Sequence, residues 1–314
     1  MSVPELSLII PSKDRASILA VTLSKVYQAV RNVNAEVLII NDSKTEEVVV
    51  PVEYQDKVWA INNPASGVAS ARNLGAKHAA APLLVFMDDD MWVNAGNIQA
   101  TLALHHQYGA ESRCFNLNWV YPPELQLYVQ RTQFGRYLHH YGFDSLKGWC
   151  RGLPWDDNQL FATPGITSQY LVIRKSDFQQ VGGYNENFPH AGFEDHDFSQ
   201  RLEAHHIQPY ILPTSTMFHN EADRMNLPAW LARKRRGGET RRVAVTLGHE
   251  ELAYKYGVLK GSIYRLVAFQ HSMVMGVLTL IPNHRAFDRL YFAIVNLLLG
   301  AALYTGYNTE PQGR

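Results

Sequence analysis

Cysteine is scarce in this sequence, and neither basic nor acidic residues are in excess. Only Cys114 and Cys150 occur among 314 residues, without CxxC spacing. This argues against a zinc site or a disulfide framework and favours a reducing compartment. Lysine plus arginine and aspartate plus glutamate both number 29, so net charge gives no reason to expect nucleic-acid binding.

Several familiar segments are also missing. The first residues show no basic stretch followed by an apolar one, so we expect no signal peptide and a protein that is cytoplasmic or on the cytoplasmic face of the membrane. No GxGxxG follows the first apolar run, which disfavours a dinucleotide-dependent oxidoreductase. With 46% hydrophobic residues, the chain is long enough for one large or two modest globular domains.

Apolar runs and amphipathic segments alternate in the N-terminal part of the chain. The expected strands are residues 6–10, 36–40, 58–61 and 83–87, and the expected helices among them are residues 16–30 and 68–80. This alternation predicts an α/β fold with a mostly parallel central sheet flanked by helices. Polar residues follow each strand, where open α/β sheets bind ligands.

Asp88, Asp89 and Asp90 follow the fourth expected strand directly. Three adjacent carboxylates repel one another unless solvent or a cation neutralises them, and Mg²⁺ or Mn²⁺ suits an all-oxygen site. The triplet therefore indicates a site for a metal ion and a diphosphate. A polar turn after a strand is the alternative, because aspartate is a common turn residue.

A second acidic group lies at the expected start of a helix that runs to about residue 205. It contains Glu194, Asp195 and Asp197, close to Gly192. The helix dipole accounts for one carboxylate there, but less well for a cluster. His219 follows a further expected strand at residues 207–213 and is either structural or a metal ligand.

The remaining segments allow two interpretations each. Residues 122–164 are aromatic and irregular, so their rings either stack on sugars or pack ordinarily. The basic run of residues 232–242 is a solvated helix edge or a phosphate or anionic-membrane contact. The apolar segments 266–281 and 290–307 each fall short of a membrane span. Instead of a two-span anchor we expect a helical hairpin that packs on the domain, dips into one leaflet of a membrane or forms a homodimer, with the membrane or dimer contact made through residues 264–307.

Five stretches together resemble the glycosyltransferases of family 2, which have the GT-A fold. They are residues 10–15, 39–43, 63–75, 86–90 and 182–197, with Gly182-Gly183-Tyr184 preceding Phe193-Glu194-Asp195-His196-Asp197. The resemblance covers residues 5–222. It implies a catalytic domain over 1–222, with a nucleotide-sugar half at 1–110 and an acceptor half at 111–222. Residues 223–314 form a helical C-terminal region outside the resemblance.

The resemblance implies a role for each matching residue on the donor side. Residues that line the nucleotide-sugar pocket would be Pro11, Asp14, Asp42, Arg72, Asp88 and Asp89. Arg72 would approach the diphosphate, and Asp89 would be the member of the triplet that best tolerates replacement. Asp90, with Asp88 and His219, would hold Mn²⁺ or Mg²⁺. Departures at Asn41 and Lys13-Asp14 leave the donor open, with UDP-sugars favoured.

On the acceptor side, Asp195 would be the general base and Glu194 would grip a glycan or lipid-linked glycan, with inversion at the anomeric carbon. A cell-surface polysaccharide pathway is the expected setting. Two alternatives stay open. One is a non-catalytic nucleotide-sugar-binding scaffold, which the retained acids disfavour. The other is a sugar-phosphate nucleotidyltransferase, which would need a glycine-rich phosphate loop that residues 11–14 do not provide.

Overall fold

The computed structural model describes residues 2–309, which fall into two compact units. The first comprises the chain up to Tyr121 with Ser145–Glu186 and Glu194–Asn220, and the second comprises Pro122–Asp144, Asn187–Phe193 and the chain from Glu221. The division at Asn220 lies close to the boundary expected at residue 222. However, residues 122–144 and 187–193, expected in the acceptor half, belong to the second unit.

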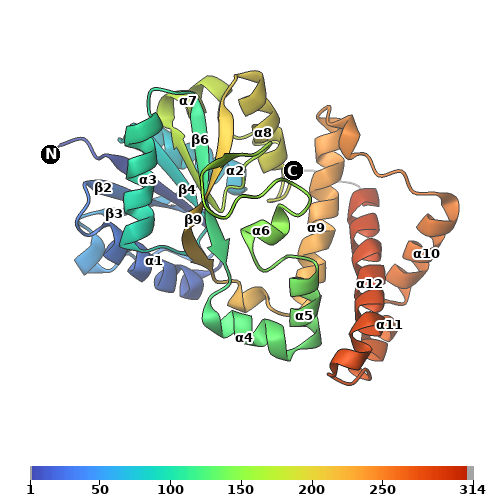
Figure 1. Ribbon diagram of the computed structural model, residues 1–314. Helices are drawn as coiled ribbons and strands as arrows, with labels where there is room; N and C mark the ends of the chain where they lie inside the picture. The colour runs from blue at the N-terminus through green and yellow to red at the C-terminus, as the bar shows by residue number, and fades with distance from the viewer. Residues whose placement is uncertain (1, 310–314) are drawn as a thin grey trace. The chain divides into compact units, whose positions relative to one another are not determined.

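The first unit is built on a single mixed sheet (Figure 1). Its strands are β1 (Leu6–Ser12), β2 (Ala35–Asn41), β3 (Val58–Asn62), β4 (Leu83–Met87), β5 (Met91–Trp92), β6 (Arg113–Val120), β7 (Phe161–Ala162), β8 (Tyr170–Arg174) and β9 (Gln208–His219). The order is β3-β2-β1-β4-β8-β6-β9-β5, with β7 paired to β9. The four N-terminal strands β3, β2, β1 and β4 are parallel, as expected, whereas β8 runs antiparallel to both β4 and β6.

Helices cover both faces of this sheet. They are α1 (Ala16–Val30), α2 (Val68–His78), α3 (Ala95–Tyr108), α6 (Leu146–Trp149), α7 (Lys175–Val181) and α8 (Glu194–Ala204). Helices α2, α7 and α8 share one core cluster with alternate strand residues such as Ile9 and Phe86. Helix α2 approaches the sheet closely at Gly75, where a Cβ would lie 2.3 Å from Cγ2 of Ile9. Helices α1 and α3 lie in front of the sheet in Figure 1.

The parallel strands bring their polar ends to one edge of the sheet. Ser12 at the end of β1 pairs in register with Asn41 at the end of β2. The backbone N–H of Asp42 donates to the carbonyl of Ser12 at 2.8 Å. Because β4 is also parallel to β1, the acidic triplet emerges at this same edge.

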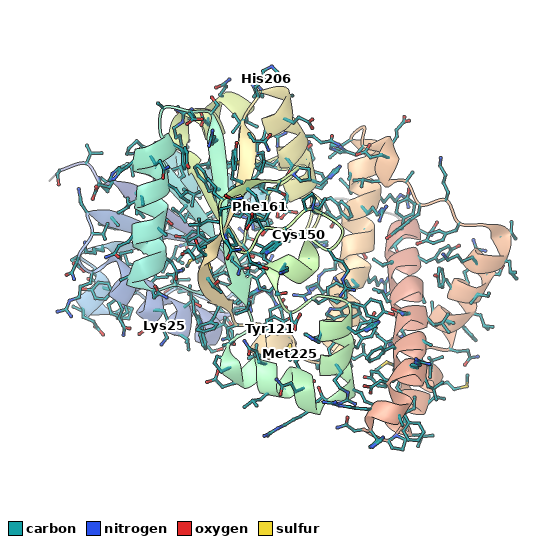
Figure 2. All side chains as sticks on the ribbon, viewed as in Figure 1. Lys25, Tyr121, Cys150, Phe161, His206 and Met225 are labelled. Atoms are coloured by element: carbon teal, nitrogen blue, oxygen red, sulfur yellow. The ribbon has the colours of Figure 1, made fainter. Side chains whose placement is uncertain are left out.

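Helix α8 carries the second acidic group and leads into β9. The chain reverses after the helix at His206, which has a left-handed φ of 58° and is labelled at the tip of this turn in Figure 2. The backbone N–H of Ile207 donates to the carbonyl of Leu202 at 2.9 Å, which closes the helix end. The turn thus fixes the start of β9, the strand that ends in His219.

The second unit is helical. Its helices are α4 (Pro123–Arg131), α5 (Gln133–His140), α9 (Leu227–Thr246), α10 (Val258–Phe269), α11 (His271–Thr279) and α12 (Asp288–Asn308), with short 3-10 turns at Ala222–Arg224, Glu250–Leu252 and Arg285–Phe287. The irregular structure expected for residues 122–164 is therefore wrong for α4 and α5. The rings of Phe134 and Tyr137 lie 5.8 and 5.7 Å from that of Trp230, so these aromatic residues pack ordinarily within the unit.

The apolar C-terminal segments differ from the expected hairpin. The segment 266–281 is interrupted at Gln270, which separates α10 from α11. Both helices contact α12. Arg285–Asn308 forms one helical stretch of 24 residues, long and apolar enough by length and composition to cross a membrane, with 22% of its most apolar window buried. The expectation that the second segment is too short to span a membrane is therefore wrong.

Two glycines allow α9 and α12 to pack backbone against backbone. A Cβ on Gly306 would lie 1.9 Å from the carbonyl oxygen of Arg235, and one on Gly238 would lie 2.5 Å from that of Leu303. Neither backbone oxygen can rotate away as a side chain can. The close approach of α9 and α12 therefore requires glycine, which has no Cβ, at positions 238 and 306.

Gly306→Ala is expected to destabilise the second unit. The added methyl group must push the two helices apart, and overpacking of this kind costs about 1–3 kcal/mol of unfolding free energy. Urea unfolding followed by circular dichroism measures the loss. Gly276→Ala in α11 is the matched control, because nothing lies within 4 Å of its Cβ position. An unchanged midpoint for Gly306→Ala would contradict the close helix contact.

Candidate active site

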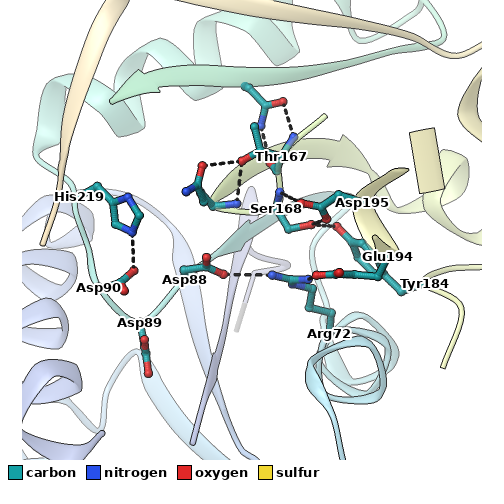
Figure 3. A network of polar contacts seen from close by, with 12 residues as sticks. Arg72, Asp88, Asp89, Asp90, Thr167, Ser168, Tyr184, Glu194, Asp195 and His219 are labelled. Atoms are coloured by element: carbon teal, nitrogen blue, oxygen red, sulfur yellow. Dashed lines mark hydrogen bonds and ion pairs between the residues drawn. The ribbon is translucent and has the colours of Figure 1, made fainter. Parts of the chain in front are cut away.

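The three carboxylates after β4 point to different partners (Figure 3). Asp88 remains 32% exposed and lies 3.0 Å from Nη2 of Arg72. Asp89 and Asp90 are buried. The three carboxylates therefore have different environments: Asp88 faces Arg72, whereas Asp89 and Asp90 are buried.

Asp90 and His219 form a buried pair. Oδ1 of Asp90 lies 3.2 Å from Nε2 of His219, and Oδ2 lies 2.9 Å from Nη1 of Arg15. The His219 ring packs edge-on against Trp119, with centroids 4.8 Å apart. The backbone N–H of Asn220 also donates to the carbonyl of Asp90 at 2.8 Å. The end of β9 thus fixes His219 beside the triplet.

Asp89 holds the loop that follows β1. Its carboxylate accepts a hydrogen bond from Oγ of Ser12 at 2.7 Å and another from Arg15. Burial and the neighbouring Asp90 raise the pKa of Asp89 to about 7, and Arg15 and Ser12 partly offset this rise. These contacts give Asp89 a structural role, because its loss would remove a partner of Arg15 and Ser12; its tolerance to replacement stays a prediction.

The residues present fit a divalent cation. Asp90 and His219 offer a carboxylate oxygen and an imidazole nitrogen, both ligands that Mn²⁺ accepts. Burial, and then repulsion from Asp90, raises the pKa of Asp88 and of Asp89, and a cation at this position would favour the ionised carboxylates. Asp88, however, faces Arg72 rather than the pair formed by Asp90 and His219 (Figure 3).

The residues expected on the nucleotide side lie next to the triplet at the ends of β1 and β2. Asp42 is buried and accepts hydrogen bonds from Nδ2 of Asn63 at 2.8 Å and from the N–H of Gly67 at 3.1 Å. Asp14 has a left-handed φ of 54°, and its carboxylate accepts from Oγ of Ser43 at 2.6 Å. Pro11 is buried within β1, which leaves its ring little surface for a ligand.

Arg72 connects the two acidic groups. It is buried on α2, where Nη2 donates to Asp88 and Nη1 donates to Glu194, both at 3.0 Å. Its guanidinium carbon lies 5.2 Å from the ring centroid of Tyr184. The surrounding carboxylates raise the pKa of Arg72, so it stays charged. One fixed cation therefore serves both the triplet and the start of α8.

Asp195 is held in a defined orientation. Its carboxylate accepts hydrogen bonds from the N–H of Ser168 at 3.0 Å and from the Ser168 hydroxyl. The Ser168 hydroxyl lies 2.5 Å from that of Tyr184, which is then the donor in this contact. Burial and Glu194 raise the pKa of Asp195 to about 6, against the lowering effects of Arg72 and Ser168. A carboxylate with such a pKa can accept a proton near neutral pH.

Three residues in this arrangement had no assigned role from the sequence. Ser12 is the last residue of β1 and Arg15 stands in the loop after it, and this place at the sheet edge is the signal that could have identified them. Ser168 lies two positions before β8. Nothing in its sequence context indicates a contact with Asp195, because that contact depends on how β8 and α8 meet.

Comparison with known families places both acidic groups in matching segments. Residues 7–155 match the family described as Glycosyl transferase family 2. Residues 161–223 match the family described as N-terminal domain of galactosyltransferase. Every site residue discussed above lies in one of these two stretches.

Individual proteins give the same result. Validoxylamine A glucosyltransferase of Streptomyces hygroscopicus subsp. jinggangensis is 29% identical over 232 residues, covering 65% of this chain and 53% of that protein. An uncharacterized glycosyltransferase of Haemophilus influenzae is 32% identical over 199 residues, covering 63% of this chain and 61% of that protein. The chain thus spans between about half and three fifths of the length of these relatives.

A solved structure confirms the fold. The mannosyltransferase PcManGT from Pyrobaculum calidifontis, in complex with GDP-Man and Mn²⁺, superposes with a TM-score of 0.56 at 12% identity, covering 99% of this chain and 89% of that one. At this identity the likeness shows the GT-A fold alone. The match of residues 7–155 to that family, together with the named glycosyltransferase relatives, shows that this chain contains a glycosyltransferase domain of family 2.

Proposed function

We propose that the chain is a metal-dependent, inverting transferase that moves a sugar from a nucleoside-diphosphate sugar to a hydroxyl of a glycan or lipid-linked glycan. One observation carries this proposal. The acidic triplet after β4 and the acidic start of α8 meet at one sheet edge, joined by Arg72. A UDP-sugar is the favoured donor, cell-surface polysaccharide synthesis is the favoured setting, and the cytoplasm or the cytoplasmic membrane face is the expected location.

The donor would occupy the edge formed by the ends of β1, β2 and β4. Asp90 and His219, with Asp88, would hold Mn²⁺ or Mg²⁺, and the bound ion would offset the negative charge of the leaving diphosphate. Asp42 and Asp14 lie next to the triplet, where they would contact the nucleoside. The presence of GDP-Man and Mn²⁺ in the solved mannosyltransferase supports this class of donor and metal.

Asp195 would act as the general base. The acceptor oxygen forms a bond to the anomeric carbon, while the bond from that carbon to the diphosphate oxygen breaks. The acceptor proton passes to the Asp195 carboxylate, and the nucleoside diphosphate leaves with the electron pair. Ser168 holds the base in place, and Glu194 would contact the acceptor sugar. A direct displacement of this kind inverts the anomeric centre, since no enzyme nucleophile takes part.

Isothermal titration calorimetry with Asp90→Ala tests the donor site. A thermal-shift screen of UDP- and GDP-sugars with Mn²⁺ first identifies the donor, because a bound ligand raises the melting temperature. We expect Asp90→Ala to weaken donor binding about tenfold or more and to remove its dependence on Mn²⁺.

Asp156→Ala is the control for this titration. Asp156 is partly exposed and accepts hydrogen bonds from its neighbours Asn158 and Gln159. Its variant should bind the donor as the wild type does. Metal-dependent donor binding that survives in a folded Asp90→Ala protein would refute the metal site.

A further inference from the structure

Helices α10 and α11 present apolar side chains on their outward faces. Val258, Leu259, Phe269 and Leu280 are 89%, 77%, 84% and 80% exposed. The exposed large apolar residues continue along both helices, including Ile263, Leu266 and Met273. Leu259, Ile263 and Leu266 follow a spacing of four and three residues, which places them on one helical face.

Few residues of α10 and α11 are buried inside the second unit, fewer than the large apolar residues that these helices expose. On α10 the buried positions are Gly261 and Val267, and on α11 the buried position is Leu278. Gly261 lies against the ring of Tyr304 of α12, with its Cβ position 3.5 Å away. The outward face of a surface helix is normally polar, so an apolar face of this extent indicates a partner.

The charges of this segment are of one sign. Residues 253–287 contain Lys255, Lys260, Arg265 and Arg285 but no aspartate or glutamate. All four of these basic residues are exposed. An apolar face bordered by cations alone is complementary to anionic lipid headgroups over an acyl interior. A second copy of the chain would bring the same cations together, with no acid in the segment to offset them.

We propose that α10 and α11 form a docking surface for an anionic membrane, with the two helices lying in the interface rather than crossing it. Helix α10 has 12 residues and α11 has 9, too few for the ~20 residues that a span requires. The longer α12 is engaged by α9 through Gly238 and Gly306, and α9 carries a basic run that hydrocarbon would not accept. The proposal is independent of the transferase activity.

Vesicle flotation with the full chain tests this surface. The protein should float with vesicles of phosphatidylcholine and phosphatidylglycerol in equal parts, but not with phosphatidylcholine alone. High salt should release it, because screening removes the electrostatic attraction. In Leu266→Glu with Phe269→Glu, the bound fraction should fall about tenfold or more, and in Lys255→Glu with Lys260→Glu it should fall by a similar factor.

The matched control is Val49→Glu with Val52→Glu. These two valines are 83% and 81% exposed in the first unit, so the variant removes exposed apolar surface outside the proposed one. It should float as the wild type does. Equal flotation of all variants overturns the proposal, as does flotation that resists high salt and alkaline carbonate, which would indicate an inserted span. Absence of flotation, with a dimer by light scattering that Leu266→Glu and Phe269→Glu dissociate, would assign the surface to a second copy.

Discussion

Replacing Asp195 by asparagine is expected to lower sugar transfer about a thousandfold while donor binding survives. The amide keeps the shape of the side chain and can still accept from Ser168, but it cannot take the acceptor proton. The nucleotide-side residues belong to other elements, so the donor site should remain intact. Turnover with a radiolabelled nucleotide sugar and titration of the donor measure the two effects separately.

Asp197→Asn is the control for this variant. Asp197 stands in the same helical turn, but its carboxylate pairs with Arg201 at 2.6 Å. It should retain most activity. The pH profile provides a second test. Since the base must be deprotonated and its pKa in the free enzyme is raised to about 6, wild-type kcat/KM should fall as the pH drops through about 6 rather than about 4. Full turnover by Asp195→Asn would show that another group accepts the proton.

Arg72→Met is expected to lower the free energy of unfolding by about 3–5 kcal/mol. Arg72 and Glu194 are each only 3% exposed at the side chain, so removing the cation deprives a buried carboxylate of this ion pair. Asp88 loses the same partner. Chemical denaturation followed by tryptophan fluorescence measures the change. Donor binding should weaken as well, because Asp88 is no longer held in place.

A double variant identifies the cause of this loss. Adding Glu194→Gln to Arg72→Met removes the buried charge that has lost its Arg72 ion pair and should restore part of the stability. Lys147→Met is the surface control, because Lys147 and Asp157 are 54% and 64% exposed, and exposed pairs contribute little. If Arg72→Met proved as stable as the wild type, the bridge would not hold the two acidic groups together.

The N-terminal half of the fold was predictable because its signals are local. Residues 6–10, 36–40, 58–61 and 83–87 are apolar runs too short for helices, and all become strands of the sheet, with β3 at its edge. Helix α1 begins and ends at the expected residues, since its apolar spacing is regular and polar loops flank it. The triplet could be placed at the sheet edge because parallel strands share one polar end.

Other features depend on contacts between distant residues. Helices α4 and α5 were not expected, because their aromatic residues contact distant parts of the chain: Phe134 and Tyr137 of α5 pack against Trp230, and Tyr128 of α4 donates to the carbonyl of Met225. The sequence could not distinguish an exposed apolar face on α10 and α11 from a hairpin packed on the domain, because apolar spacing does not indicate which helix face is covered. Likewise, three adjacent aspartates look equivalent in sequence, and only the positions of Arg15, Arg72 and His219 distinguish them.

The position of Arg72 between Asp88 and Glu194 has a kinetic consequence. A donor–metal complex that draws Asp88 toward itself would leave the guanidinium charge to Glu194 and Asp195 alone. The affinity of Glu194 and Asp195 for an acceptor would then change once the donor is bound. By thermodynamic linkage, a bound acceptor would change the affinity for the donor by the same factor. We therefore expect the binding of donor and acceptor to be coupled, so that the KM for the acceptor depends on the donor concentration.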